Sequence, residues 1–487
     1  MVAQYEATDK ELRKASAYAD QVMKKFSVET SMRQDIFEKL KILEQKDISV
    51  LNAEMQRYLK RLIKLGRRKG LHLSNDIQEE VKKHSNEINN LLANSRDTVH
   101  NFLVDLAEKL QPLWQKEKQA LLKLKEEECL QLGIPFNGKL SAWDMRYYDN
   151  MLKERIYSVD QEKLREYFPL DTVLSGMLKI YEGLLGLVFE QVPGVKLWHP
   201  EVSMYRVNNE ASGELLGYFV LDLFPREGKY SYFRNTGLQP GCLKPDGTRQ
   251  IVAVALLCNF TKPMADKPSL LTHDEVKTLF HEFGHTMHFL CSKATLQMFE
   301  GTKAELDFLE CPSQMLENWV WEAEPLTKMS GHYVTGKPLP PELLEPLVAS
   351  RLAGVAGFSL RHISLCLLDY TIHIQPHVDA QKVFKELQEK LLQYSPQEGT
   401  NMVSQFIHLV QGYDGQYYSY LWSEVFSMDL FSARFKKEGV FNEQTGMDYR
   451  RKILEPAGTK DAVDMLRDFL GREPNNEAFL ISKGLSK

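Results

Sequence analysis

Two histidines and a glutamate are grouped in the run His-Glu-Phe-Gly-His at residues 281–285. On a helix, His281 and His285 differ by about 40° in azimuth and about 6 Å in rise, so both imidazoles can reach one metal ion. Glu282 can then accept a proton from a water molecule bound to that metal. The run therefore predicts a catalytic zinc site, because structural zinc sites usually close all four positions with cysteine and histidine.

A catalytic zinc ion usually has three protein ligands and one open position. A third histidine at the spacing HExxHxxGxxH would require glycine at 288 and histidine at 291, but the chain has His288 and Cys291 there. We expect His288 to be a packed helix residue. The remaining option is a carboxylate from a second helix, and spacing alone leaves six candidates: Glu300, Glu305, Asp307, Glu310, Glu317 and Glu322. Asp307 is equally consistent with a solvated carboxylate or with a group that orients a ligand histidine.

The elements around this run indicate the fold class. Thr272 followed by Glu275 is typical of a capping box at the start of a helix. Residues 195–261 contain short β-rich runs separated by glycine and proline, which predicts a small sheet directly before that helix. Helical spacing prevails elsewhere. We therefore expect a mainly α fold with a small β-sheet beside the active site.

Composition excludes several classes of partner. The net charge of the 487-residue chain is −5, so it lacks the basic field that nucleic-acid binding requires. No apolar run approaches the roughly 18–20 residues of a membrane helix. The six cysteines are scattered, and the first ten residues lack the apolar core of a signal peptide. We expect a cytoplasmic protein, with a mitochondrial location open if a targeting segment is missing from this chain.

Longer runs around the motif resemble the thimet oligopeptidase and neurolysin family of zinc oligopeptidases. The resemblance is carried by His281–His288, Phe308–Trp319, Glu166–Pro169, Phe224–Tyr230, Gly237–Cys242 and Tyr417–Met428. It runs from about residue 100 to the C-terminus and more loosely through residues 8–90. It implies a two-lobed, zincin-like metallopeptidase with a deep channel. The implied lobes are a shortened helical N-terminal lobe at 1–165 and a catalytic lobe at 166–487, which holds the sheet, zinc helices at about 272–330 and C-terminal helices.

The resemblance also implies the roles of individual residues. Glu310 is the implied third ligand of one zinc ion per chain. His408, Tyr417 and Tyr420 are implied to line the site opposite the metal, where their donors can stabilise negative charge on the carbonyl oxygen. The implied activity is that of a monomeric zinc endopeptidase, which hydrolyses short peptides through a metal-activated water with Glu282 as general base.

Departures from the family leave a second function open. The run Asn89–Arg96 joins two segments that family members keep far apart, so a helical block that helps to wall the channel is missing. Ser231–Thr236 replaces a histidine and small residues near the zinc, and its bulky Tyr232 and Phe233 can alter peptide binding. Gln411 replaces a usual glycine. The alternative is therefore a catalytically impaired derivative that binds peptides or a partner protein.

Overall fold

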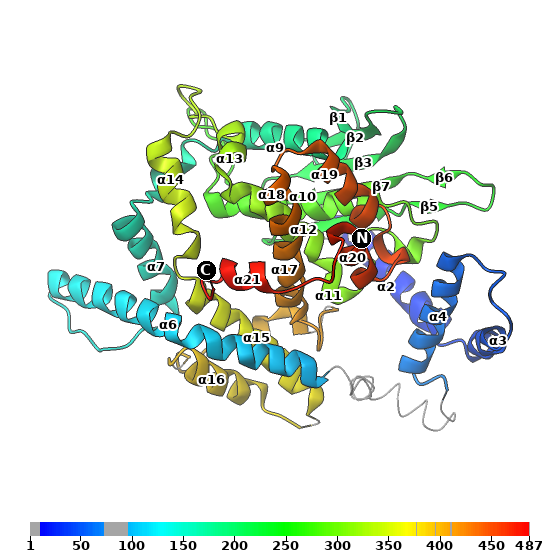
Figure 1. The fold of residues 1–487 in the computed structure, drawn as a ribbon, viewed down its shortest axis with the longest axis horizontal. Helices are drawn as coiled ribbons and strands as arrows, with labels where there is room; N and C mark the ends of the chain where they lie inside the picture. Colours follow the sequence, from blue (N-terminus) through cyan, green and yellow to red (C-terminus); the bar gives the residue numbers. More distant parts are fainter. Residues whose placement is uncertain (1–9, 73–95, 376, 395, 410–411, 487) are drawn as a thin grey trace.

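The computed structural model describes residues 10–72, 96–375, 377–394, 396–409 and 412–486, which are mainly helical (Figure 1). The helices before the sheet are α2 (Lys10–Ser31), α3 (Gln34–Glu44), α4 (Ala53–Arg68), α6 (Arg96–Leu132), α7 (Ala142–Tyr157), α8 (Gln161–Arg165) and α9 (Leu170–Leu185). The helices after it are α10 (His273–Cys291), α11 (Leu306–Leu309), α12 (Cys311–Leu316), α13 (Ala323–Met329), α14 (Pro341–Ala349), α15 (Val355–Ile374), α16 (Ala380–Leu391), α17 (Ser419–Leu430), α18 (Lys436–Glu438), α19 (Glu443–Tyr449), α20 (Ala462–Leu470) and α21 (Glu477–Ser482). The predicted fold class, mainly α with one small sheet, is confirmed.

The main sheet has five strands in the order β1-β2-β3-β7-β4. Their bounds are β1 (Leu187–Gln191), β2 (Ser203–Asn209), β3 (Leu215–Asp222), β4 (Arg234–Gln239) and β7 (Val252–Leu257), and the ribbon of β5 (Cys242–Leu243) and β6 (Arg249–Gln250) is separate. All neighbouring pairs are antiparallel except β3 and β7, which run parallel. The sheet begins at Leu187 rather than near residue 195, because β1 contains neither the glycine nor the proline on which the prediction relied.

Helix α10, which carries the His-Glu-Phe-Gly-His run, packs against this sheet. It begins with the predicted capping box, in which the Thr272 side chain accepts from the Glu275 amide and the Glu275 carboxylate accepts from the Thr272 amide. The Phe283 ring lies 5.3 Å from that of Phe219 on β3. On another side of α10, a Cβ atom added to Gly284 would lie 2.7 Å from the Cα atom of Ser313. Glycine at this position therefore allows α12 to approach α10 closely.

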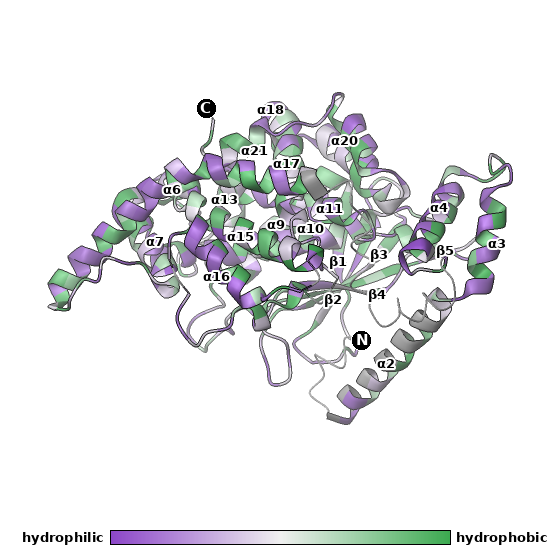
Figure 2. Ribbon diagram, turned by 90° about the horizontal axis from the view of Figure 1, so that it is seen from below, coloured by the Kyte–Doolittle hydropathy of each residue, from purple (hydrophilic) through white to green (hydrophobic). Residues whose placement is uncertain are grey.

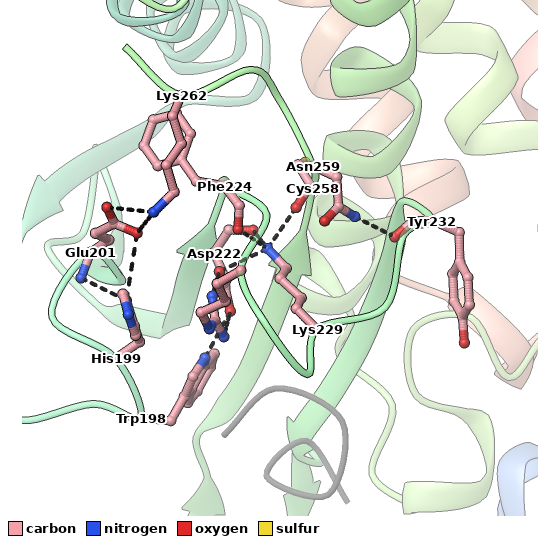
Figure 3. A network of polar contacts seen from close by, with 11 residues as sticks. Trp198, His199, Glu201, Asp222, Phe224, Lys229, Tyr232, Cys258, Asn259 and Lys262 are labelled. Carbon is pink, nitrogen blue, oxygen red and sulfur yellow. Dashed lines mark hydrogen bonds and ion pairs between the residues drawn. The ribbon is translucent and has the colours of Figure 1, made fainter. Parts of the chain in front are cut away.

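A buried lysine ties together the carboxyl ends of the parallel strands β3 and β7 (Figure 3). The Lys229 ammonium group donates to the backbone oxygens of Asp222 and Cys258 at 2.9 and 2.6 Å, and its side chain is only 1% exposed. It also donates to the Phe224 carbonyl at 3.0 Å. These contacts hold the loop that leads into β4 at the edge of the sheet. The network therefore fixes the start of the segment that leads from β3 to β4.

Helices α3 and α4 lie at one end of the molecule and α6 and α7 at the other, with most of the other helices between them (Figure 1). Along α6, hydrophilic and hydrophobic residues alternate, as expected of a helix with one buried face (Figure 2). This helix packs against α15 from the C-terminal half, and the division into lobes at residue 165 stays a prediction. No single helix in the described ranges is long and apolar enough to cross a membrane, although one pair bent by 44°, Pro341–Leu352 with Val355–Ile374, passes the same test together.

A large cavity lies between α4 and α11. Its volume is about 1210 Å³, and Arg57 and Lys64 from α4 face Asp307 and Leu309 from α11 across it. Gly415 from the loop before α17 also lines it. Helix α4 is held in place by Arg57, which donates to the Gly458 carbonyl at 2.9 Å and pairs with Glu305. The cavity therefore borders both the helix that leads to Glu310 and the loop that leads to α17.

Candidate metal centre

Helices α10 and α12 bring three predicted ligands to one point. The ligand atoms of His281, His285 and Glu310 all lie within 4.8 Å of one another. One carboxylate oxygen of Glu310, Oε2, lies 3.3 Å from Nε2 of His281 and 3.1 Å from Nε2 of His285. Glu310 is 2% exposed, and it immediately precedes α12, which Gly284 allows to pack close. Of the six carboxylates that the spacing left open, the structure brings Glu310 to both histidines.

The separations within this group fit a zinc ion. Tetrahedral ligands at about 2.0–2.2 Å from zinc lie roughly 3.4 Å apart, close to the two measured separations. Two imidazoles and one carboxylate also form a known ligand set for catalytic zinc, with a fourth position open. Burial raises the pKa of Glu310, but the charge on His285 and a hydrogen bond from His281 outweigh it and hold that pKa well below its usual value. This lowered pKa favours the ionised carboxylate, which is the form that binds a metal ion.

Glu317 orients the first of these histidines. Its Oε1 lies 2.7 Å from Nδ1 of His281, and its Oε2 pairs with Lys277 at 3.0 Å. Burial opposes ionisation of Glu317, but Lys277 and His281 lower its pKa to about 2. Of the two readings of Asp307, the structure favours the solvated carboxylate, because Asp307 lines the cavity and Glu317 occupies Nδ1 of His281. Glu317 lies about two helical turns after Glu310, so both acids face α10.

Removing the charge of Glu317 should weaken metal binding. For Glu317→Gln we expect zinc affinity to fall by about 10–100-fold, because a carboxylate that accepts from a ligand histidine fixes its orientation and raises its basicity. Competition with a fluorescent zinc chelator measures this change. Asp307→Asn is the matched control, since Asp307 is a nearby, partly buried acid that, in the part of the chain that the structure describes, makes no hydrogen bond or ion pair with either ligand histidine. Equal affinity in the Glu317 variant and the wild type would contradict the assigned role.

The position of Glu282 suits proton transfer. Its side chain is on α10 between the two histidines in sequence, and the residue is 8% exposed. Its backbone carbonyl accepts from Asn235 Nδ2 on β4 at 3.2 Å and from the Thr286 hydroxyl at 3.2 Å. Burial raises the pKa of Glu282, while His281 and His285 oppose that shift. Within the described ranges its carboxylate has no hydrogen-bond partner, so it is available to a water molecule.

The predicted aromatic residues come together around the start of α17, where Tyr420 lies in the first turn of the helix and Tyr417 precedes it. The His408 ring centroid lies 5.1 Å from that of Tyr417 and 6.0 Å from that of Tyr420. The Tyr417 and Tyr420 rings are 5.2 Å apart. Burial raises the pKa of both phenols, so they remain protonated hydrogen-bond donors at neutral pH. The structure therefore gathers all three residues into one cluster.

Tyr413 joins the same cluster and was missed in the sequence. Its hydroxyl donates to Oε1 of Glu310 at 2.6 Å. Its ring stacks on Tyr420 at 5.2 Å with an interplanar angle of 19°. The Tyr413 contact therefore connects the aromatic cluster to the metal ligands. The only signal in the sequence was its position next to Gly412, within the run from His408 to Tyr420.

Some of the positions at which the sequence departs from the family lie near this site. Phe233 precedes β4 and packs inward, with its ring 5.3 Å from that of Phe260. Tyr232 is 37% exposed, and its ring lies 5.0 Å from that of Tyr230. Both aromatic residues therefore lie before the edge strand rather than on it. Gln411 and residues 89–95 of the junction with the shortened block lie outside the described residues.

Comparisons with known proteins agree with the geometry. The model of Peptidase family M3 matches residues 23–485. The chain is 40% identical over 406 residues to thimet-like oligopeptidase of Dictyostelium discoideum, covering 82% of this chain and 60% of that protein. It is 34% identical over 476 residues to oligopeptidase A of Escherichia coli strain K12, covering 93% and 68%. The chain thus spans about 60% of the length of the first of these relatives.

A solved structure shows the same fold. The M32 carboxypeptidase from Deinococcus radiodurans R1 aligns with a TM-score of 0.54, covering 98% of this chain and 94% of that one at 11% identity. The zincin-like fold expected from the sequence resemblance is thereby supported at the level of architecture. The family match over residues 23–485 goes further, because it includes both candidate ligand helices and residues 412–420 (the aromatic loop). The chain belongs to Peptidase family M3.

Proposed function

We propose that this chain is a zinc-dependent endopeptidase that hydrolyses short peptides. The observation that carries the proposal is the convergence of His281, His285 and Glu310 on one point, next to Glu282. The hydroxyl of Tyr413 reaches the same point from the aromatic loop. The names of the relatives, thimet-like oligopeptidase and oligopeptidase A, support peptides as the substrate class.

The ligand set and Glu282 divide the chemistry between them. Zinc, when bound by the three ligands, supplies a Lewis acid that polarises a peptide carbonyl and lowers the pKa of a water molecule. Glu282 accepts the proton of the attacking water and passes it to the nitrogen of the leaving amine as the C–N bond breaks. Burial favours this exchange because it raises the pKa of Glu282 toward the working pH, where a group both accepts and releases protons efficiently.

The aromatic cluster supplies donors to the carbonyl oxygen. The phenols of Tyr417 and Tyr420 are protonated at neutral pH because burial raises their pKa. Hydrogen bonds from such fixed donors strengthen as negative charge develops on the oxygen in the transition state. Of the two phenols, Tyr420 is the stronger candidate, because it stacks on Tyr413, which contacts Glu310. His408 is the third member of this donor set.

Two features favour an extended peptide as the substrate. Strand β4 lies at the edge of the sheet and beside α10, so a peptide can pair with it as an added strand. The cavity of about 1210 Å³ borders Leu309 and Gly415, which are close in sequence to Glu310 and Tyr417. This volume exceeds the roughly 300–1,000 Å³ of most small-molecule pockets. We infer that the cavity is part of the channel that receives short peptides.

The proposed setting is a monomer in a reducing compartment. All six cysteines are free thiols, and five of them are buried. A chain that keeps free thiols throughout is typical of reducing compartments such as the cytosol. The cytoplasmic location and the monomeric state are predictions that sedimentation and localisation experiments can check.

An internally quenched short peptide tests the proposed activity. We expect cleavage by the purified chain, loss of cleavage after treatment with a zinc chelator, and its return when zinc is added back. Mass spectrometry of the products identifies internal peptide bonds as the sites of cleavage. A chain that is folded and binds zinc but leaves a panel of such peptides intact would sink the endopeptidase proposal. That result would instead favour a derivative that only binds peptides or a partner.

A further inference from the structure

A buried carboxylate on α15 accepts hydrogen bonds from the backbone of the aromatic loop. Asp369 is 1% exposed, and its Oδ1 accepts a hydrogen bond from the Gly415 amide at 2.9 Å. Its Oδ2 accepts from the Tyr417 amide, also at 2.9 Å. Each carboxylate oxygen thus binds one amide, and the two amides flank Gln416. Each hydrogen bond to a charged acceptor is about twice as strong as a hydrogen bond between neutral groups.

The helix that carries Asp369 is firmly anchored. Leu365 and Leu368 of α15 are buried in one cluster with Phe406 and Leu409, which precede the aromatic loop. On the next turn, His373 Nδ1 lies 3.0 Å from Oδ1 of Asp369 and 2.8 Å from its backbone oxygen. These contacts keep the carboxylate in one orientation. Asp369 therefore presents a fixed pair of acceptors to the loop.

The backbone conformation of the aromatic loop depends on its contact with Asp369. Gly415 has a φ angle of +71°, and a Cβ atom added there would lie 3.5 Å from Cβ of His373. Among the described residues, Asp369 is the only charged side chain that binds the backbone amides of residues 412–418. The Cys366 thiol is a weaker contact to the same segment, 3.7 Å from the Tyr417 carbonyl. The carboxylate thus attaches this segment to α15, whereas the Tyr413 hydroxyl attaches it to Glu310 at 2.6 Å and Gln314 Nε2 donates to the Tyr420 carbonyl at 3.0 Å.

We propose that Asp369 is a positioning residue that holds the aromatic loop, and with it Tyr417 and Tyr420, at the distance from the metal ligands at which their hydroxyl groups can reach the substrate. This inference rests on the proposed peptidase function. Asp369 does not touch the reacting atoms; it acts through the amides of Gly415 and Tyr417. The ring of Tyr417 packs 5.2 Å from that of Tyr420, so a shift of the Tyr417 backbone also disturbs the packing of Tyr420.

The substitution Asp369→Asn separates this role from the chemistry. Asparagine keeps one oxygen acceptor, but its NH₂ group faces the second amide and leaves that amide unpaired. We expect kcat for peptide cleavage to fall by roughly 10²-fold, as a displacement near 1 Å can produce, while KM and zinc content change little. We also expect hydrogen–deuterium exchange to become at least about tenfold faster in a peptide covering residues 412–420, because one of its protecting bonds is lost.

Two further variants complete the test. Glu117→Gln is the matched control, since Glu117 accepts from the amides of Ala356 and Gly357 at the opposite end of α15, at 3.1 and 2.9 Å. It should leave loop exchange and kcat within about twofold of the wild type, as expected of a site with no shared partners. Asp369→Glu keeps the buried charge and displaces both oxygens, so it should change exchange and kcat in the same direction as Asp369→Asn.

The exchange measurement keeps this inference separate from the proposed activity. Faster exchange confined to the loop supports the positioning role even if the wild-type chain cuts no peptide. Unchanged loop exchange in both Asp369 variants would overturn it. Equal acceleration in peptides from α10 would also overturn it, since that result indicates a general loss of stability rather than release of the loop.

Discussion

Replacing Glu282 with glutamine is expected to lower kcat for peptide hydrolysis by roughly 10²–10⁴-fold, the contribution that a positioned general base makes. Glutamine has nearly the same size and keeps a hydrogen-bonding oxygen, but it cannot accept the proton of the attacking water. Glu282 is not one of the three ligand residues, so zinc content should not change. Steady-state kinetics with a quenched peptide and zinc analysis by mass spectrometry measure the two quantities on the same preparation.

The matched control for this change is Asp274→Asn on the same helix. Asp274 lies in the first turn of α10 with its side chain 78% exposed, so its neutralisation should leave kcat unchanged. A Glu282→Gln enzyme that retains wild-type kcat would remove Glu282 from the mechanism. A variant that loses its zinc as well would assign the residue to metal binding instead.

The second large effect is expected at Tyr420. Tyr420→Phe should lower kcat by roughly 10²–10³-fold, as loss of one oxyanion donor does, with a smaller change in KM. The reason is that the hydroxyl group contributes mainly when charge develops on the carbonyl oxygen, and the aromatic stacking on Tyr413 is retained. Kinetics over a range of peptide concentrations separate the two constants.

Tyr394→Phe is a suitable comparison for this prediction. Tyr394 is a partly buried tyrosine that packs against the cluster of α6 and α15, away from the metal ligands, and burial likewise raises its pKa. It should show wild-type kcat. A Tyr420→Phe variant in which only KM rises would indicate that the hydroxyl binds substrate and transition state equally, rather than the transition state alone.

Local features of the site could be predicted from the sequence. The capping box of Thr272 and Glu275 is present, because it depends only on residues three positions apart. His288 is a packed residue as expected, with its pKa lowered to about 3 by burial. The family was identified correctly from short runs of residues, since matching such runs does not require knowing which residues lie close together in the fold.

Features that depend on tertiary packing could not be derived in this way. Spacing alone left six acids as candidate ligands, because the choice of Glu310 follows from the close packing of α12 on Gly284. The same packing brings Glu317, and not Asp307, to His281. Tyr413 was missed because its partner Glu310 lies in a distant part of the chain. Sequence distance does not report any of these contacts, and only the resemblance indicated Glu310.

The order of these elements along the chain has a consequence for biosynthesis. The candidate metal ligands all fall between residues 281 and 310, whereas the aromatic residues that face them begin only at His408, and their segment is attached through α15. Because a ribosome releases the N-terminal part first, a nascent polypeptide acquires its zinc ligands well before the groups that face them. A product that ends before residue 408 would therefore carry His281, His285 and Glu310 but none of the hydrogen-bond donors that face them. The split of the site between two distant segments delays its assembly until residues 408–420 have been synthesised.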